Sequence, residues 1–131
     1  NSWRASNMSI ETAIQEFIRE ELDTYAPADV DEILTNDQIY GYGQGFEFDG
    51  AEYVIMLDDE ADLAWDEALQ SYLDECVLPE LPDGNLRNYF DEEAWKRDAK
   101  HDGRGHALNH YDGSEYELHV DDVWYAVYRV N

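Results

Sequence analysis

The sequence predicts an α+β fold in a single domain spanning residues 1–131, with two or three amphipathic helices, a β-hairpin in the N-terminal half and a C-terminal antiparallel meander. Three observations predict it. Apolar residues recur at helical spacing in two long segments, Asp-Gly pairs separate short apolar segments, and aromatic residues make up 14% of the chain. Disordered acidic chains are poor in aromatic residues, so we expect a packed core despite the high charge.

The first helix is predicted from an apolar stripe that follows Ser9, a suitable N-cap, and ends near Pro27. Residues 1–7 lack the apolar centre of a signal peptide. They are interpreted as a cloning remnant before a natural start at Met8, or as native sequence. The apolar stripe consists of Ile10, Ile14, Phe17, Ile18 and Leu22.

Residues 28–45 are predicted to form a short second helix and then a loop. The helix is expected around Val30, Ile33 and Leu34. The run Gly41-Tyr42-Gly43-Gln44-Gly45 does not have the glycine spacing of a dinucleotide-binding loop, and no Lys follows it. We therefore expect a flexible loop that leads into a strand.

A hairpin and a long helix are predicted next. Asp49-Gly50 supplies the positive φ angles of a tight turn between strands 46–48 and 51–56. Asp58 or Asp59 is expected to cap a helix that continues to about Val77. Its predicted buried stripe is Ala61, Ala64, Trp65, Ala68, Leu69, Tyr72, Leu73 and Cys76.

The C-terminal third is predicted to hold one more helix and three strands. Asp91 is expected to cap a helix over residues 92–100, and Gly103 to end it. The strands are expected at 106–111, 115–120 and 123–130, with turns at residues 112–113 and 121–122. Alternation of apolar and polar residues over 115–120 indicates a strand with one wet face.

The charge is concentrated in one stretch of the chain. The net charge is −24, and residues 20–86 contain twenty Asp and Glu but no Lys, Arg or His. Such a surface repels nucleic acid and anionic membranes and attracts basic partners, including proteins with a DNA-binding groove. No apolar run is long enough to cross a membrane, and the single cysteine, Cys76, fits a reducing cytoplasm.

Carboxylates on two helices are the candidate partner-binding residues. On a helix, acids three or four positions apart lie about 5–6 Å apart at Cβ, close to the spacing of phosphates along a DNA strand. Asp62 and Asp66 have this spacing. The candidates are Asp59, Glu60, Asp62, Asp66, Glu67 and Asp74 on the long helix, with Glu16, Glu20 and Asp23 at the first helix as the other face.

Other chemistry has weaker support in the sequence. The run from His101 through Asp102 to His106 could bind a divalent metal, but Gly103 and Gly105 favour a tight turn instead. Paired carboxylates are too numerous to indicate acid–base catalysis, and Cys76 is expected to be buried and inert. No catalytic residue, metal or cofactor is predicted.

The run Asn88-Tyr89-Phe90-Asp91-Glu92-Glu93-Ala94-Trp95-Lys96-Arg97-Asp98 and the overall acidity resemble the ArdA-type antirestriction proteins of plasmids, transposons and phages. Those proteins carry a similar Tyr-Phe-Asp segment, then an aromatic residue and Arg-Asp. The resemblance implies a DNA mimic that occupies the DNA-binding groove of a restriction-modification enzyme, often as a homodimer. This chain is short for that family.

The sequence thus leads to three hypotheses. The first is an inhibitor in the bacterial cytoplasm that presents a DNA-like surface to a restriction-modification or CRISPR enzyme. The second is an acidic interaction or assembly module of a phage or mobile element, which binds through apolar residues such as Leu63. The third is a metal-dependent enzyme that uses His101, Asp102 and His106.

Overall fold

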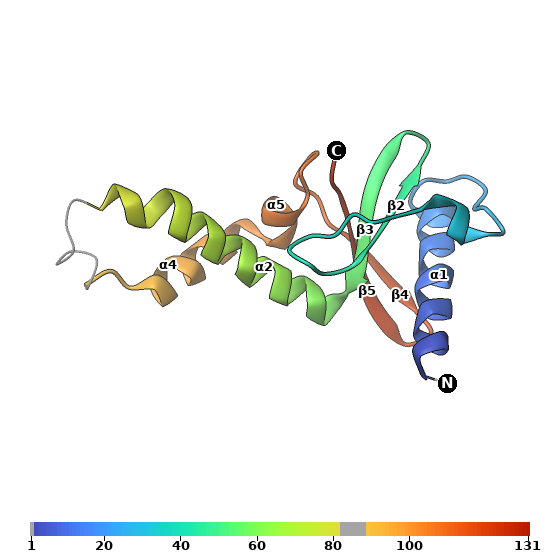
Figure 1. Cartoon of the computed structure of the whole chain (residues 1–131), viewed down its shortest axis with the longest axis horizontal. Coiled ribbons are helices and arrows are strands. Elements are labelled where there is room, and N and C mark those ends of the chain that lie inside the picture. Colours follow the sequence, from blue (N-terminus) through green and yellow to red (C-terminus); the bar gives the residue numbers. More distant parts are fainter. Residues whose placement is uncertain (1, 82–88) are drawn as a thin grey trace.

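The computed structural model describes residues 2–81 and 89–131, and its centre is an antiparallel five-stranded sheet (Figure 1). The strand order is β1-β2-β3-β5-β4. The mixed α+β class is therefore confirmed. Residues 82–86 of the acidic stretch and Asn88 of the resemblance motif lie outside the described residues. The strands are β1 Leu34–Thr35, β2 Gln44–Phe48, β3 Ala51–Leu57, β4 Tyr116–Val120 and β5 Val123–Arg129.

Two of the three predicted turns between strands, at residues 49–50 and 121–122, adopt the left-handed backbone that tight hairpins require. Asp49 and Gly50 have φ angles of 53° and 81°, and Asp121 and Asp122 have 52° and 63°. Right-handed strand twist favours such turns, and short polar residues or glycine tolerate them best. The early hairpin and the pairing of the last two strands of the meander are confirmed.

The helices cover both faces of the sheet. The longest are α1 Ser2–Glu20 and α2 Asp58–Tyr72, which pack on opposite faces of the sheet. After α2, a π-helical turn (η2, Leu73–Val77) and a 3-10 turn (η3, Leu78–Glu80) extend the segment. The remaining helical elements are η1 Val30–Ile33, α4 Glu92–Ala99, η4 Lys100–Asp102 and α5 Arg104–Leu108.

Alternation along β3 decides which helix packs on which face. Tyr53 and Ile55 point into a core with Phe17 of α1, while Val54 and Met56 point into a core with α2 and Leu108 of α5. Figure 1 shows α1 beside the sheet and α2 running away from it, with α4 alongside α2. The two helices that carry the predicted acids therefore lie on opposite faces of the sheet.

The N-terminal elements differ from the prediction at their ends. Helix α1 begins at Ser2 rather than after Ser9, and ends at Glu20 because Asp23 takes a positive φ of 53° and turns the chain out of the helix. The expected second helix is one 3-10 turn, capped by the Asp29 side chain. Pairing of Leu34–Thr35 with β2 competes with any longer helix there.

The long helix differs at both ends. Its N-cap is Leu57, so Asp58 and Asp59 lie in the first turn instead of capping it. Tyr72 and Cys76 were expected to be buried but are exposed, Tyr72 to 56%. The π-helical turn begins after Tyr72 and changes the phase of the stripe at Cys76, and this end of the segment extends beyond the sheet that would cover both residues (Figure 1).

The strand predicted at 106–111 is wrong, because α5 occupies Arg104–Leu108. Gly103, with φ of 92°, ends the preceding turn and starts this helix. Gly105 has no side chain to clash with the backbone of residues 113–115, where a Cβ would meet the Gly113 carbonyl at 2.7 Å. This close approach buries Leu108 under the sheet, which an extended strand would not do.

None of the described helices combines the length and apolar character needed to cross a membrane.

Replacing Gly45 by Ala should destabilise the fold by about 2 kcal/mol, because overpacking costs roughly 1–3 kcal/mol. A Cβ at Gly45 would lie 2.3 Å from Thr35 Oγ1 and 2.8 Å from the Asp37 carbonyl oxygen. Urea unfolding measures the change. Gly41→Ala is the control, since its Cβ would meet nothing within 4 Å and only its positive φ costs energy. Equal losses for the two variants would contradict the steric argument.

Candidate protein-binding interface

Three of the predicted acids on α2 and its continuation form an exposed row on the side away from the sheet. Asp59, Glu67 and Asp74 are all exposed, and no Lys or Arg of the described residues forms an ion pair with them. The Asp74 carboxylate accepts one hydrogen bond, from Gln70 Nε2 at 3.0 Å. These carboxylates are therefore available to a cationic partner.

The other three predicted acids of this face already have partners. Asp62 Oδ1 accepts from Arg104 at 2.8 Å, and Asp66 Oδ1 lies 3.6 Å from Lys96 Nζ. Glu60 Oε1 accepts from the backbone N–H of Leu57 at 3.1 Å and so caps its own helix. The closely spaced pair Asp62 and Asp66 is thus partly neutralised by cations that the sequence pattern did not place there.

The second predicted face surrounds the C-terminal half of α1. Arg19 pairs with Glu16 at 3.1 Å, while Glu20 and Asp23 are exposed. The carboxyl of Glu20 hydrogen-bonds that of Glu16, and this contact followed by charge repulsion raises the pKa of Glu20. Repulsion of this kind indicates carboxylates that lack enough cations.

Acids that the sequence did not single out join this second face. Burial, followed by contact with Asp31 and the nearby charge of Asp29, raises the pKa of Glu11. The contact exists because Gln15 Nε2 donates to the Pro27 carbonyl at 3.1 Å and holds the 27–31 segment against α1. No local pattern in the sequence identifies this contact, because Glu11 lies in α1 and Asp31 lies in η1.

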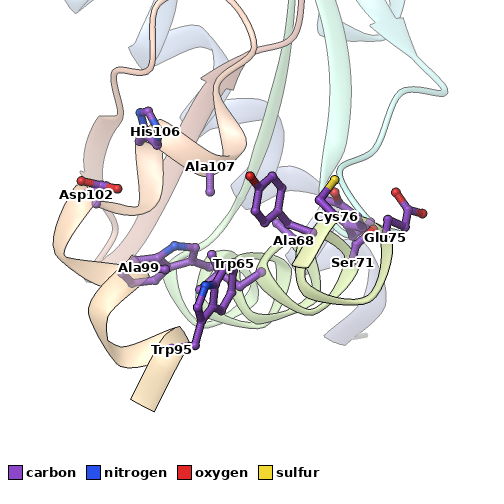
Figure 2. A pocket seen from close by; sticks show the side chains of 14 residues that line it. Trp65, Ala68, Ser71, Glu75, Cys76, Trp95, Ala99, Asp102, His106 and Ala107 are labelled. Atoms are coloured by element: carbon purple, nitrogen blue, oxygen red, sulfur yellow. The ribbon is translucent and has the colours of Figure 1, made fainter. Parts of the chain in front are cut away.

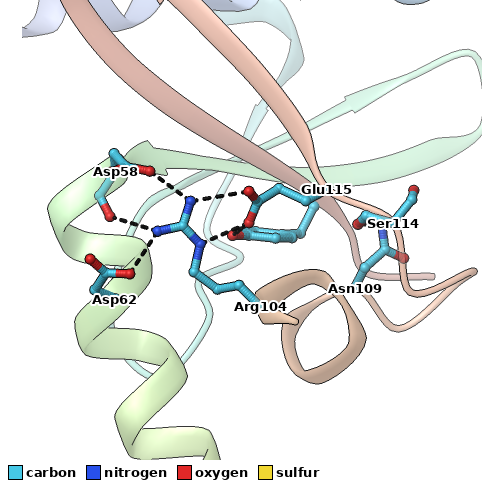
Figure 3. A network of polar contacts seen from close by, with 7 residues as sticks. Asp58, Asp62, Arg104, Asn109, Ser114 and Glu115 are labelled. Carbon is cyan, nitrogen blue, oxygen red and sulfur yellow. Dashed lines mark hydrogen bonds and ion pairs between the residues drawn. The ribbon is translucent and has the colours of Figure 1, made fainter. Parts of the chain in front are cut away.

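Arg104 of α5 joins the start of α2 to Glu115, just before β4 (Figure 3). We call Arg104, Asp58, Asp62, Glu115 and Tyr128 the Arg104 cluster. Its guanidinium donates to both carboxylate oxygens of Glu115, at 2.8 and 3.1 Å, and to Asp58 Oδ1 at 2.6 Å. It also donates to Asp62. The Arg104 side chain is only 11% exposed, so these contacts are shielded from solvent.

The Arg104 cluster shifts the pKa of its members in opposite directions. Burial alone would raise the pKa of Glu115, but hydrogen bonds from Arg104 and the Tyr128 hydroxyl hold it below its usual value. Burial and then the contact with Glu115 raise the pKa of Tyr128. At neutral pH the cluster therefore holds an ionised Glu115 and a protonated Tyr128 hydroxyl.

The candidate metal ligands do not converge. His101 and His106 are exposed, and the described residues contain no group of three His, Cys, Asp or Glu side chains arranged to hold a metal ion. The segment instead provides the end of one helix and the start of another around Gly103. This geometry agrees with the tight turn that Gly103 and Gly105 predict.

Residues 92–98 of the motif that carries the resemblance lie in α4. The Asp91 carboxylate caps the helix by accepting from the Ala94 N–H at 3.0 Å, and Trp95 stacks on Tyr72 with ring centroids 5.9 Å apart. No protein-family model matches the chain, and searches of curated proteins and of solved structures find no match either. The function is therefore inferred from the geometry of the molecule.

Adding NaCl should raise the melting temperature of the isolated protein. Like charges along α2 and around α1 repel, and screening acts over about 8 Å at 0.15 M salt. Thermal unfolding followed by circular dichroism between low and moderate NaCl measures the effect. A flat or falling curve would mean that ion pairs such as Arg104–Asp58 dominate over the repulsion.

Mild acid should stabilise the protein, and stronger acid should unfold it. The raised pKa values of Glu11 and Glu20 mean that the folded state binds their protons more tightly, so this contribution grows as pH falls toward the usual range of a Glu carboxyl, about pH 4. The pKa of Glu16 is lowered by its hydrogen bond with Glu20 and then by Arg19, which offsets part of this gain. The lowered pKa of Glu115 acts oppositely, and its contribution is lost below about pH 4, the usual range of a Glu carboxyl. Thermal unfolding against pH should therefore pass through a maximum, and a steady decline from pH 7 would contradict this balance.

Proposed function

We propose that this protein is a DNA mimic that inhibits a DNA-binding defence enzyme of the restriction-modification or CRISPR type. One observation carries the proposal. Among the described acids between Glu20 and Leu81, only Asp58, Asp62 and Asp66 form ion pairs with Lys or Arg. Folding tolerates this repulsion at a cost in stability, and a basic partner would remove it.

The exposed row on α2 has a spacing compatible with a DNA strand. A helix rises about 1.5 Å per residue, so Asp59, Glu67 and Asp74 are about 12 and 10.5 Å apart along its axis. Neighbouring phosphates of one strand are separated by roughly two rises of 3.4 Å, or about 7 Å. The row therefore offers one carboxylate for about every second phosphate, on a helix that runs away from the sheet (Figure 1).

Competition with DNA tests the proposal. The protein should displace a labelled duplex from a restriction-modification or CRISPR enzyme, and its affinity should fall steeply with NaCl, as expected when both ligands occupy one basic groove. Binding that leaves the duplex in place would contradict mimicry. The proposal also places the protein in the bacterial cytoplasm, where such enzymes act.

A second function is favoured by one apolar side chain. Leu63 is 52% exposed and lies one helical turn from both Asp59 and Glu67, in the middle of the acidic row. An interaction or assembly module would use such a residue as an anchor. In that case Leu63→Ser should weaken partner binding more than loss of the neighbouring charges, and salt should have little effect.

A further inference from the structure

A cavity of about 510 Å³ opens between α2, α4 and α5, and the acidic row does not contribute to it (Figure 2). Tyr40, from the loop before β2, lines it as well. Its volume is in the range of sites that hold small ligands or single side chains. No local pattern in the sequence predicts the cavity, because separate segments of the chain build it.

Aromatic rings form much of its lining. Trp65, Tyr72 and Trp95 all line the cavity, and the rings of Tyr72 and Trp95 are nearly parallel, with an interplanar angle of 10°. Lys100 Nζ lies 5.3 Å from the centroid of the Trp65 ring, so one aromatic face here already receives a cation. Lys100 is not among the residues that line the cavity, so its ammonium group does not fill it.

The charges that line the cavity are negative. Glu75 and Asp102 contribute carboxylates and His106 contributes an imidazole, and the described residues that line the cavity include no Lys or Arg. Neither carboxylate forms an ion pair with a Lys or Arg of the described part of the chain. Figure 2 shows Glu75 and Asp102 at opposite ends of the lining, with Trp65 and Trp95 between them. Aromatic faces with an unpaired carboxylate at either end are complementary to a planar cation.

We propose that this cavity binds an arginine side chain of the basic partner protein. A guanidinium group is planar and weakly hydrated, stacks on aromatic rings and pairs with carboxylates, whereas an ammonium group is compact and strongly hydrated. Arginine is a common base-reading residue of DNA-binding grooves, so the partner class of the proposed function supplies it. The identity of the partner rests on that proposed function, but the chemistry of the cavity can be tested without it.

The test uses N-acetyl-arginine amide as the probe and its citrulline analogue, which has the same shape without the charge. The ¹⁵N-labelled full chain is titrated, and the indole N–H signals, assigned with single Trp→Phe variants, are followed by NMR. Arginine should shift the signals of Trp65 and Trp95. Trp124, which is 53% exposed on β5 and does not line the cavity, is the internal control and should not move.

Two charge variants make the result specific. Glu75→Gln with Asp102→Asn should weaken arginine binding up to about fivefold, since the guanidinium loses its partly exposed carboxylate partner whichever of the two it contacts. Glu47→Gln with Glu117→Gln removes the same charge at exposed strand positions and should leave binding unchanged. These substitutions lie at the surface, so the fold should survive them.

The outcomes separate this proposal from mimicry. Equal shifts with citrulline, equal weakening by both charge variants, or shifts confined to Trp124 would overturn the arginine site. Arginine binding in a protein that fails to compete with DNA would support the cavity while rejecting the proposed function. Competition with DNA that persists without any arginine-dependent shift at Trp65 or Trp95 would support the proposed function and reject the arginine site.

Discussion

Replacing Arg104 by Met should lower the free energy of unfolding by about 3 kcal/mol, the largest stability loss that we expect from one side chain, because removing one partner of a buried ion pair costs about 3–5 kcal/mol. Glu115 is only 18% exposed, so its carboxylate would remain in a shielded place without a cation. Asp58 and Asp62 are about half exposed and can be solvated, so the expected loss is at the low end of the range.

Urea unfolding with the slope checked for two-state behaviour measures this loss. Arg97→Met is the matched control, because Arg97 is exposed on α4 and its replacement removes the same charge. It should change stability by less than about 0.5 kcal/mol. If the two variants lose equal stability, the ion pairs of Arg104 with Asp58 and Glu115 do not stabilise the fold. Adding Glu115→Gln to Arg104→Met should recover part of the loss, since it removes the unpaired charge.

The second large effect is expected on partner binding. Replacing Asp59 by Asn, Glu67 by Gln and Asp74 by Asn together should weaken binding to a DNA-binding defence enzyme by about a hundredfold or more, and lower the salt slope by up to about three units. A phosphate-like contact is distributed, so each carboxylate alone contributes little. These residues have no ion pair among the described residues, so the fold should be unaffected.

A charge-matched variant separates the effect of losing the α2 row from the effect of lowering the net charge. Glu47→Gln, Asp98→Asn and Glu117→Gln remove three exposed carboxylates from other elements and should reduce binding only slightly. If both triple variants bind equally, the α2 row is not the contact surface. Neutralising Glu20, Asp23 and Asp31 then tests the face around α1. Binding that survives neutralisation of both faces would reject mimicry.

Local chemistry was sufficient for much of the fold. Asp49-Gly50 and Asp121-Asp122 predicted the two hairpin turns that form, because only short polar residues and glycine adopt positive φ at low cost. Asp112-Gly113 was also expected to join two strands, but α5 lies before it instead. Helical periodicity placed α2, and Asp91 predicted the start of α4 through its side-chain cap. The net charge of −24 and its concentration before residue 87 also need no structure.

The boundaries that the sequence missed depend on contacts between distant residues. Helix α5 replaced an expected strand because Gly105 allows the chain to pack against residues 113–115. Tyr72 and Cys76 are exposed because this end of the segment extends beyond the sheet, and a π-helical turn also changes the phase of the stripe at Cys76. Side-chain pattern alone carries no information on where the opposing surface stops.

The sequence by itself determined that this protein is acidic, folded and α+β, since composition, turn chemistry and periodicity are properties of neighbouring residues. Only the tertiary structure decided which carboxylates are available. Arg104 and Lys96 neutralise Asp58, Asp62 and Asp66 from about 30 or more positions away, leaving Asp59, Glu67 and Asp74 without an ion pair among the described residues. Charge pairing depends on distance in space, which the packing of α4 and α5 against α2 sets and no local pattern records.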